Sequence, residues 1–246
     1  LAMGAPSWPV IIVAVLYGAV LNLDPARPNW PDRDRFILSK GHACPVVYAA
    51  LARTGFFSVD ILPTLRAYGS ILQGHPDMKK TPGIDMTTGS LGHGIATGAG
   101  MAAAGRVRGA QYRVFVICGD GELNEGIIWE SAITAAHLKL DKLTVFVDRN
   151  GYQSGGSTEE VSGLTAIAPM FDAIGWHVQE IDGHDHAAIL DSIEQAQSVS
   201  ERPSVIVATT TKGKGVPFME NNNSWHKGVP TAEELRVALE ALGGTA

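Results

Sequence analysis

Two short apolar runs, joined by one helical pattern, constrain the fold of this chain more than any other feature. Arg113–Cys118 and Leu143–Asp148 are rich in β-branched residues, which predicts two buried strands. Glu125–Leu140, between them, has the apolar spacing of a helix. A β-α-β unit of this kind places its two strands parallel in one sheet. Polar residues follow both strands, with Asp120 after the first and Asn150 after the second.

These two polar positions predict a ligand site at one edge of the sheet. Open α/β sheets bind ligands at the carboxyl ends of parallel strands, so Asp120 and Asn150 are expected to face each other across one crevice. Hard oxygen ligands beside the glycine-rich turn Gly119–Gly121 suit a Mg²⁺ ion that also holds a diphosphate. The alternative is that both segments are only tight turns or helix caps.

Strand and helix patterns alternate through most of the chain. This alternation predicts one α/β domain over residues 1–246, with a mostly parallel sheet and helices on both faces. The expected strands are Phe36–Leu38, Val114–Cys118, Leu143–Val147, His177–Ile181 and Val205–Thr209. The expected helices are Val10–Val20, His42–Arg53, Val59–Tyr68, Gly92–Arg106, Glu125–Leu140, Ala166–Ala173, His186–Val199 and Ala232–Leu242.

Charge and composition exclude several classes of protein. The net charge is −6 and no basic stripe occurs, which gives no support to nucleic-acid binding. The apolar run Val10–Leu23 is shorter than the roughly 20 residues that a membrane-spanning helix needs, so a buried helix is expected instead. Cys44 and Cys118 have neither metal-ligand spacing nor a disulfide pattern, and they fit a reducing cytoplasm.

Four histidines lie in loops beside glycine or proline. They occur in SKGHA (His42), GHPD (His75), TTGSLGHG (His93) and SWHKG (His226). Any one of them alone would more often be structural or merely exposed. Together they suggest a polar site, because imidazoles with near-neutral pKa values can hydrogen-bond sugar hydroxyls and transfer protons.

The order of these motifs resembles that of transketolases. FILSKGHA, GHPD, TTGSLGHGI, GDGELNEG, DRN and WHKG follow one another over Val10–Leu242, nearly the whole chain. This order is typical of the domain that binds the diphosphate of thiamine diphosphate in that family. The TTGSLGHG variant and the late block MENNNSWHKGVPTAEEL are similar to the separate N-terminal subunits of split transketolases.

The resemblance implies roles for individual residues. Asp120, Asn150 and the backbone carbonyl of Tyr152 would hold Mg²⁺. His42 and His226 would contact the diphosphate or the donor sugar, and His75 would stabilise the dihydroxyethyl intermediate and contact substrate hydroxyls. Residues from five segments would contact the cofactor; they are His42, Gly89, Ser90, Leu91, Gly119, Asp120, Gly121, Glu122, Asn150, Tyr152 and His226.

The resemblance also implies a partner. The glutamate that faces the cofactor pyrimidine lies on a second α/β domain in this family, so a separate C-terminal subunit is expected, in an α2β2 assembly. Glu125 resembles a subunit-contact glutamate, although an acid at a helix N-terminus is favoured in any case. The small-residue helix Gly94–Gly105 is expected to pack closely against a neighbour and to lie near subunit contacts.

One position departs from the family pattern. Ala2 stands where the family usually has a substrate-contacting histidine, which implies either an unusual donor or acceptor sugar or a remodelled start of the chain. The expected reaction is transfer of a two-carbon ketol unit from a ketose to an aldose. The alternatives are the α subunit of a 2-oxo acid dehydrogenase, which RNGYQSG resembles locally, and a non-catalytic module that kept the fold.

Overall fold

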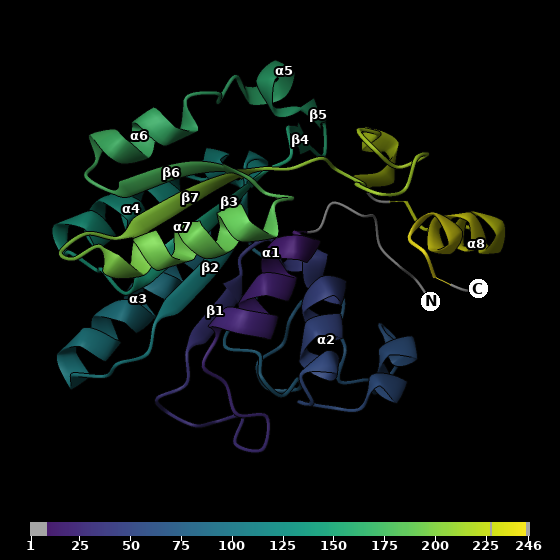
Figure 1. The fold of residues 1–246 in the computed structure, drawn as a ribbon, viewed down its shortest axis with the longest axis horizontal. Coiled ribbons are helices and arrows are strands. Elements are labelled where there is room, and N and C mark those ends of the chain that lie inside the picture. Colours follow the sequence, from purple (N-terminus) through teal and green to yellow (C-terminus); the bar gives the residue numbers. More distant parts are fainter. Residues whose placement is uncertain (1–8, 227, 245–246) are drawn as a thin grey trace.

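A five-stranded, all-parallel sheet forms the centre of the molecule (Figure 1). The computed structural model describes residues 9–226 and 228–244. The strand order is β1-β2-β3-β7-β6, and every neighbouring pair is parallel. The five strands span Arg35–Leu38 (β1), Val114–Gly119 (β2), Leu143–Arg149 (β3), His177–Asp182 (β6) and Ser204–Thr209 (β7). The predicted parallel sheet is thus confirmed.

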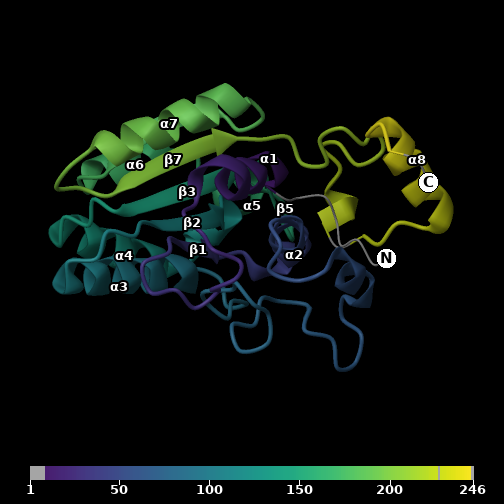
Figure 2. The same cartoon turned by 60° about the horizontal axis from the view of Figure 1, so that its bottom comes forward.

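Helices cover both faces of this sheet, as expected (Figures 1 and 2). One face packs against α1, α2 and α7, and the other against α3, α4 and α6. The helices span Val10–Val15 (α1), Cys44–Arg53 (α2), His93–Arg108 (α3), Gly126–His137 (α4), Thr158–Ser162 (α5), Ile167–Ala173 (α6), His186–Ser198 (α7) and Ala232–Ala241 (α8). None of these helices is long and apolar enough to cross a membrane, a finding that covers the described residues.

The two cores follow from the alternation of side chains along the strands. In β2, Val114 and Val116 lie in the core under α3 and α4, whereas Phe115 and Ile117 lie in the core under α1 and α7. All six residues of β2 are buried. A strand that is apolar on both faces is typical of a parallel sheet covered by helices on each side.

The small residues of α3 let this helix pack closely on the sheet. A side chain at Gly98 would place its Cβ atom 2.6 Å from a methyl carbon of Val116, and one at Gly94 would meet Ser39 at 2.4 Å. Neither position has room for a larger residue. The expected close packing of this helix is therefore confirmed against the sheet, while its role in subunit contacts stays a prediction.

The structure differs from the sequence expectations in several short regions. Val59–Thr64 forms a 3-10 helix that ends before Leu65, and Pro63 inside it has no N–H group to continue a longer helix. The helix from Val10 closes with a π-helical turn at Leu16–Val20. The hairpin of β4 (Tyr152–Gln153) and β5 (Gly156–Ser157) was not expected, because two-residue strands leave no periodic signal.

The register places the candidate site at one end of the sheet. Gly119 at the end of β2 pairs with Asp148 near the end of β3, and Asp148 pairs with Ala208 in β7. The loops that leave these strands therefore emerge side by side. The chain after β7 forms a long loop, which we call the late loop (residues 210–226), before α8 at the side of the molecule (Figure 2).

Candidate active site

Asp120 connects the turns that follow β2 and β3. Its carboxylate accepts hydrogen bonds from the backbone N–H groups of Gly121 (2.8 Å) and Gly151 (2.7 Å). Only 3% of Asp120 is exposed, and this burial raises the pKa of its carboxyl group to about 6. A bound cation would favour the ionised form, because it replaces the stabilisation that water gives an exposed carboxylate.

Asn150 shapes the turn that follows β3. Its Oδ1 atom accepts a hydrogen bond from the Tyr152 backbone N–H (3.0 Å), and Gly151 between them has a φ of 75°, which glycine adopts without strain. The predicted metal ligands are therefore a carboxylate, a carboxamide and a backbone carbonyl. Hard oxygens in this number fit Mg²⁺, which completes its coordination with phosphate oxygens and water.

No alternative metal centre is apparent in the described part of the chain. Within residues 9–226 and 228–244, no three His, Cys, Asp or Glu side chains are grouped so that they could hold a metal ion. Both cysteines are free and buried, and burial raises the pKa of each thiol. A thiolate or imidazole metal site therefore has no support in these residues.

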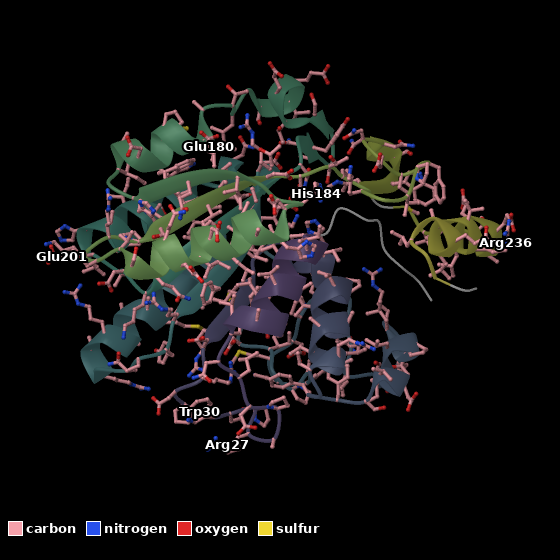
Figure 3. The ribbon with its side chains drawn as sticks, in the orientation of Figure 1. Arg27, Trp30, Glu180, His184, Glu201 and Arg236 are labelled. Atoms are coloured by element: carbon pink, nitrogen blue, oxygen red, sulfur yellow. The ribbon has the colours of Figure 1, made fainter. Side chains whose placement is uncertain are left out.

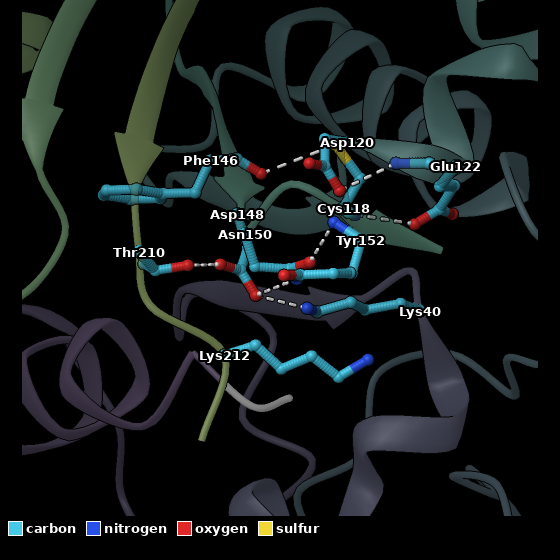
Figure 4. Close-up of polar contacts among 12 residues, drawn as sticks. Lys40, Cys118, Asp120, Glu122, Phe146, Asp148, Asn150, Tyr152, Thr210 and Lys212 are labelled. Carbon is cyan, nitrogen blue, oxygen red and sulfur yellow. Dashed lines mark hydrogen bonds and ion pairs between the residues drawn. The ribbon is translucent and has the colours of Figure 1, made fainter. Parts of the chain in front are cut away.

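A buried ion pair lies directly below the metal-site turns (Figure 4). Lys40, which follows β1, pairs with Asp148 at the end of β3. Thr210 donates a hydrogen bond to the other Asp148 oxygen, and Asn150 Nδ2 lies 3.5 Å from this carboxylate. Asp148 thus ties together the ends of three strands. Lys40 in SKGHA and Asp148 in DRN are thus further residues of the site, beyond those predicted from the sequence.

Glu122 holds three loops together from inside the protein. Its carboxylate accepts hydrogen bonds from the Ser39 hydroxyl and from the backbone N–H groups of Gly92 (2.7 Å) and Gly119 (3.1 Å). Only 3% of the residue is exposed. Since the buried carboxylate is already bound by these donors, the backbone of Glu122, rather than its side chain, is the part available for the predicted contact with the cofactor.

Three of the predicted histidines come together with two lysines. The rings of His42 and His226 lie 5.8 Å apart between centroids, and Lys212 Nζ lies 2.8 Å from His226 Nδ1. Burial, together with the nearby charges of Lys40, His226, His75 and Lys212, lowers the pKa of His42 to about 4. His42 is therefore neutral at neutral pH. An imidazole without charge can both donate and accept hydrogen bonds.

The loop before α3 closes another side of this cluster. Gly89 and Ser90 are exposed there and Leu91 is half-buried. A Cβ atom on Gly89 would lie 3.7 Å from the His75 ring, so this loop and His75 are neighbours. The preceding Thr88 has a buried hydroxyl with no hydrogen-bond partner within the described residues. This hydroxyl packs against Gly41, where a Cβ atom would meet it at 2.5 Å.

Lys212 is a further candidate for the site, beyond the residues predicted from the sequence. Only 2% of the residue is exposed, and burial lowers the pKa of its ammonium group to about 8. Its Nζ atom donates to Asn223 Oδ1 (2.9 Å) and lies 5.4 Å from the centre of the Tyr152 ring. The available signal was its place in TKGKG, a glycine-rich segment just after a strand.

The start of the late loop is fixed by His184. This residue lies between β6 and α7, and its Nε2 atom accepts a hydrogen bond from the Thr211 backbone N–H (2.7 Å) (Figure 3). His93, by contrast, contacts the Leu91 carbonyl (3.1 Å) and is exposed. It is not among the charges that act on His42. Of the four loop histidines, the structure thus groups His42, His75 and His226.

Comparison with known proteins identifies this arrangement. Residues 3–245 match the family described as "Transketolase, thiamine diphosphate binding domain". The chain is 43% identical over 231 residues to the 6-deoxy-6-sulfo-D-fructose transketolase subunit SqwG of Clostridium sp. (strain MSTE9), covering 94% of this chain and 84% of that protein. The chain belongs to the transketolase family. The fold, the family and the presence of its thiamine-diphosphate-binding domain are therefore as the sequence predicted.

Two further transketolase relatives show how much of the family this chain represents. It is 40% identical to an apulose-4-phosphate transketolase subunit of Phocaeicola vulgatus, covering 94% of this chain and 82% of that protein. Transketolase from Leishmania mexicana has the same fold, with a TM-score of 0.89 and 33% identity, over 95% of this chain and 37% of that one. The chain thus spans most of the subunit-type relatives and about a third of the longer transketolase.

This membership settles one alternative and leaves other expectations open. The resemblance to the α subunit of a 2-oxo acid dehydrogenase is wrong at the level of family, because the transketolase match extends over nearly the whole chain. The roles of individual site residues stay predictions. Ala2, the position where the family usually has a histidine, lies outside the described residues.

Proposed function

We propose that this chain forms the metal- and diphosphate-binding half of a two-chain transketolase that moves a two-carbon ketol unit from a ketose to an aldose. The observation that carries the proposal is the convergence of two lysines and three histidines beside Asp120 and Asn150. Positive groups next to oxygen ligands suit a diphosphate held through Mg²⁺.

The residues divide the binding of the cofactor between them. Asp120, Asn150 and the Tyr152 carbonyl would hold Mg²⁺, and the backbone of Gly119–Glu122 would lie along the diphosphate. Lys212 would add positive charge on the side of the late loop. When bound, thiamine diphosphate supplies the carbon nucleophile that breaks and forms the carbon–carbon bonds, while the protein supplies position and electrostatics.

The histidines would bind and orient the sugar. His42 is neutral at neutral pH, so it can donate a hydrogen bond to one oxygen and accept one from another. His226 Nδ1 faces the Lys212 ammonium group, which donates to it, so in the neutral ring Nε2 carries the proton and serves as a donor. His75 and the backbone of Gly89, Ser90 and Leu91 complete the predicted surface toward the sugar and the rings of the cofactor.

A second subunit would complete the site. The relatives from Clostridium sp. and Phocaeicola vulgatus are both named as subunits of transketolases, which supports a partner that carries the pyrimidine-binding domain. We propose an α2β2 assembly, with Glu125 and α3 near the contacts between subunits. Two free, buried cysteines support the expected location in the reducing cytoplasm.

The sugar is proposed to be a modified or branched one. The relatives are named for 6-deoxy-6-sulfo-D-fructose and for apulose 4-phosphate, neither of which is an ordinary pentose phosphate. Ala2, in place of the usual histidine, supports the same proposal. We expect faster turnover of such a ketose than of xylulose 5-phosphate. The Ala2→His variant should reduce this difference if the position acts on specificity.

Reconstitution with the partner tests the proposed function. The chain, a candidate C-terminal subunit, Mg²⁺ and thiamine diphosphate should together transfer the ketol unit, and omission of any component should abolish transfer. Full activity of this chain alone would contradict the two-chain proposal. Cofactor binding without transfer, with every candidate partner, would instead favour a non-catalytic module.

A further inference from the structure

The late loop and the β4–β5 hairpin are joined by a set of polar contacts. The Tyr152 hydroxyl donates to the Asn221 carbonyl (3.0 Å), and Ser154 Oγ lies 3.4 Å from His226 Nε2. The two segments lie far apart in the sequence but side by side at the site. The hairpin carries a predicted metal ligand, and the late loop carries Lys212 and His226. The position of the late loop relative to the hairpin therefore affects how Tyr152, Lys212 and His226 contact a ligand together.

Asn223 lies at the centre of this connection. Its Nδ2 group donates to the backbone carbonyl of Gln153 in the hairpin (3.2 Å), and its Oδ1 atom accepts from the Lys212 ammonium group (2.9 Å). A carboxamide has a donor at one end and an acceptor at the other, and here each end has a different partner. Serine is too short to span both partners in this way, and aspartate lacks the donor.

The partners of Asn223 are sensitive to its loss. Lys212 is 2% exposed, so removal of an acceptor leaves a buried ammonium group with fewer partners, which is costly. Asn223 is only half-buried and begins the 3-10 turn Asn223–His226. A substitution at this position can therefore release the contacts without opening a cavity in either hydrophobic core.

We propose that Asn223 is a positioning residue that fixes the Lys212 ammonium group against the β4–β5 hairpin, so that Lys212 and Tyr152 reach the ligand site as one unit. The identity of that ligand, the Mg²⁺ complex of thiamine diphosphate, rests on the proposed function. Asn223 itself need not touch the cofactor. It acts through the two groups that it connects.

Two substitutions separate the two ends of the carboxamide. Asn223→Asp keeps an acceptor for Lys212 but places a carboxylate oxygen opposite the Gln153 carbonyl, so only the hairpin contact is lost. Asn223→Leu has a similar size and loses both contacts. Asn222→Asp is the matched control, because it makes the same charge change at an exposed neighbour whose side chain bonds to Phe218 and Ser224 within the late loop.

Amide hydrogen exchange in the cofactor-free chain tests the connection without reference to activity. Exchange at residues 152–157 should rise about fivefold or more in both Asn223 variants, the effect of roughly one lost hydrogen bond, and should be unchanged in Asn222→Asp. Thermal midpoints should stay close to wild type in Asn222→Asp and Asn223→Asp, and should fall by a few degrees in Asn223→Leu, which leaves the buried Lys212 ammonium group with fewer partners. Unchanged exchange in the Asn223 variants, or an equal rise in Asn222→Asp, would overturn the proposal.

Titration of the reconstituted complex with thiamine diphosphate at saturating Mg²⁺ tests the consequence for the ligand. Asn223→Leu should raise the half-saturating concentration of the cofactor about tenfold, and Asn223→Asp by less, since Lys212 keeps its partner. The rate at saturation should change little in both. A fall in that rate with unchanged cofactor affinity would contradict positioning. Failure of the wild type to bind cofactor would overturn the proposed function, but not the exchange result.

Discussion

Two buried ion pairs stand at opposite ends of β1, and they differ in what surrounds them. At the amino end, the Asp85 carboxylate accepts two hydrogen bonds from the Arg33 guanidinium group (2.7 and 2.9 Å) and one from the Phe36 backbone N–H (2.9 Å). Arg33 also donates to the carbonyls of Pro28 and Asp34. The charges of this pair are bound by each other and by the backbone, as in a structural connection.

At the carboxyl end, the charges are not matched in this way. Lys40 pairs with Asp148, but Lys212 and three histidines gather around the same site, and the Asp120 carboxyl group has a raised pKa. Burial disfavours the charged forms of both Lys212 and Asp120. A bound cation would stabilise the ionised Asp120 carboxylate, and an anion bound with it would stabilise the charged Lys212 ammonium group. The two ends thus differ in their partners: Arg33 and Asp85 bind each other, whereas the Lys212 ammonium group is bound by the Asn223 carboxamide and the Asp120 carboxylate by backbone N–H groups.

The largest expected effect is the loss of stability when the Arg33–Asp85 ion pair is broken. Asp85→Ala leaves the buried Arg33 guanidinium group without its carboxylate, and it should lower the free energy of unfolding by about 3–5 kcal/mol. Chemical denaturation of the chain without cofactor measures this change. The control is Glu201→Ala, which removes an exposed pair with Lys139 at the surface and should change stability little. Equal losses in the two variants would contradict the structural role of Asp85.

At the carboxyl end of β1, a substitution should weaken cofactor binding rather than lower the stability of the fold. Asp120→Ala removes the charged metal ligand, so retention of Mg²⁺ and thiamine diphosphate should fall by about 100-fold or more, at least the range seen for lost partners of metal ligands. Equilibrium dialysis of the reconstituted complex measures the retained cofactor. Asp85→Ala is the comparison, and its folded fraction should bind cofactor normally. Normal retention in Asp120→Ala would mean that the metal site is wrongly assigned.

The pH dependence of stability should reflect the raised pKa of Asp120. The pKa of Asp120 rises from 3.8 to about 6 on folding. Between these two pH values, the folded chain therefore keeps a proton that the unfolded chain has lost. Protonation therefore stabilises the fold, by about 1–3 kcal/mol below pH 3.8, and this contribution is lost as pH rises through about 6. The difference in unfolding free energy between wild type and Asp120→Ala isolates it. A difference that does not vary with pH would contradict the shift.

The same titration should set the acidic limit of metal binding. Mg²⁺ must displace the Asp120 proton, so affinity for Mg²⁺ with thiamine diphosphate should fall as pH drops below about 6. His42 stays neutral down to about pH 4, so it should not set this limit. His42→Gln should therefore leave the midpoint in place, as measured by cofactor titration from pH 5 to 8. A shifted midpoint in that variant would assign the limit to His42 instead.

A smaller effect should come from the lysine of the late loop. Lys212→Met keeps a long apolar stem but removes the charge near the site, and cofactor affinity should weaken about tenfold, as expected for one lost charged hydrogen bond. Lys214→Met is the matched control, because Lys214 is exposed and pairs with Glu220 at 3.9 Å. Titration with thiamine diphosphate measures both. Equal affinities in the two variants would remove Lys212 from the site.

The sequence predicted the elements that carry strong local signals. The strands at Val114–Gly119 and Leu143–Arg149 were expected to within two residues, because apolar, β-branched runs determine buried strands. The placement of Asp120 and Asn150 after adjacent strands followed from the β-α-β rule, and the register confirms that β2 and β3 are neighbours. Short elements such as the β4–β5 hairpin and α5 could not be predicted from the sequence, because tertiary contacts determine their conformation.

The class of fold, the order of the motifs and the residue types at the sheet edge all follow from the order of residues along the chain. Only the tertiary structure decided which side chains meet. Lys40 and Asp148 are 108 positions apart, and Asn223 reaches Gln153 across 70 positions. Glu122 likewise became a buried connection between Ser39, Gly92 and Gly119. Local propensity depends on neighbours in the chain, whereas such contacts depend on how packed helices and strands bring distant loops together.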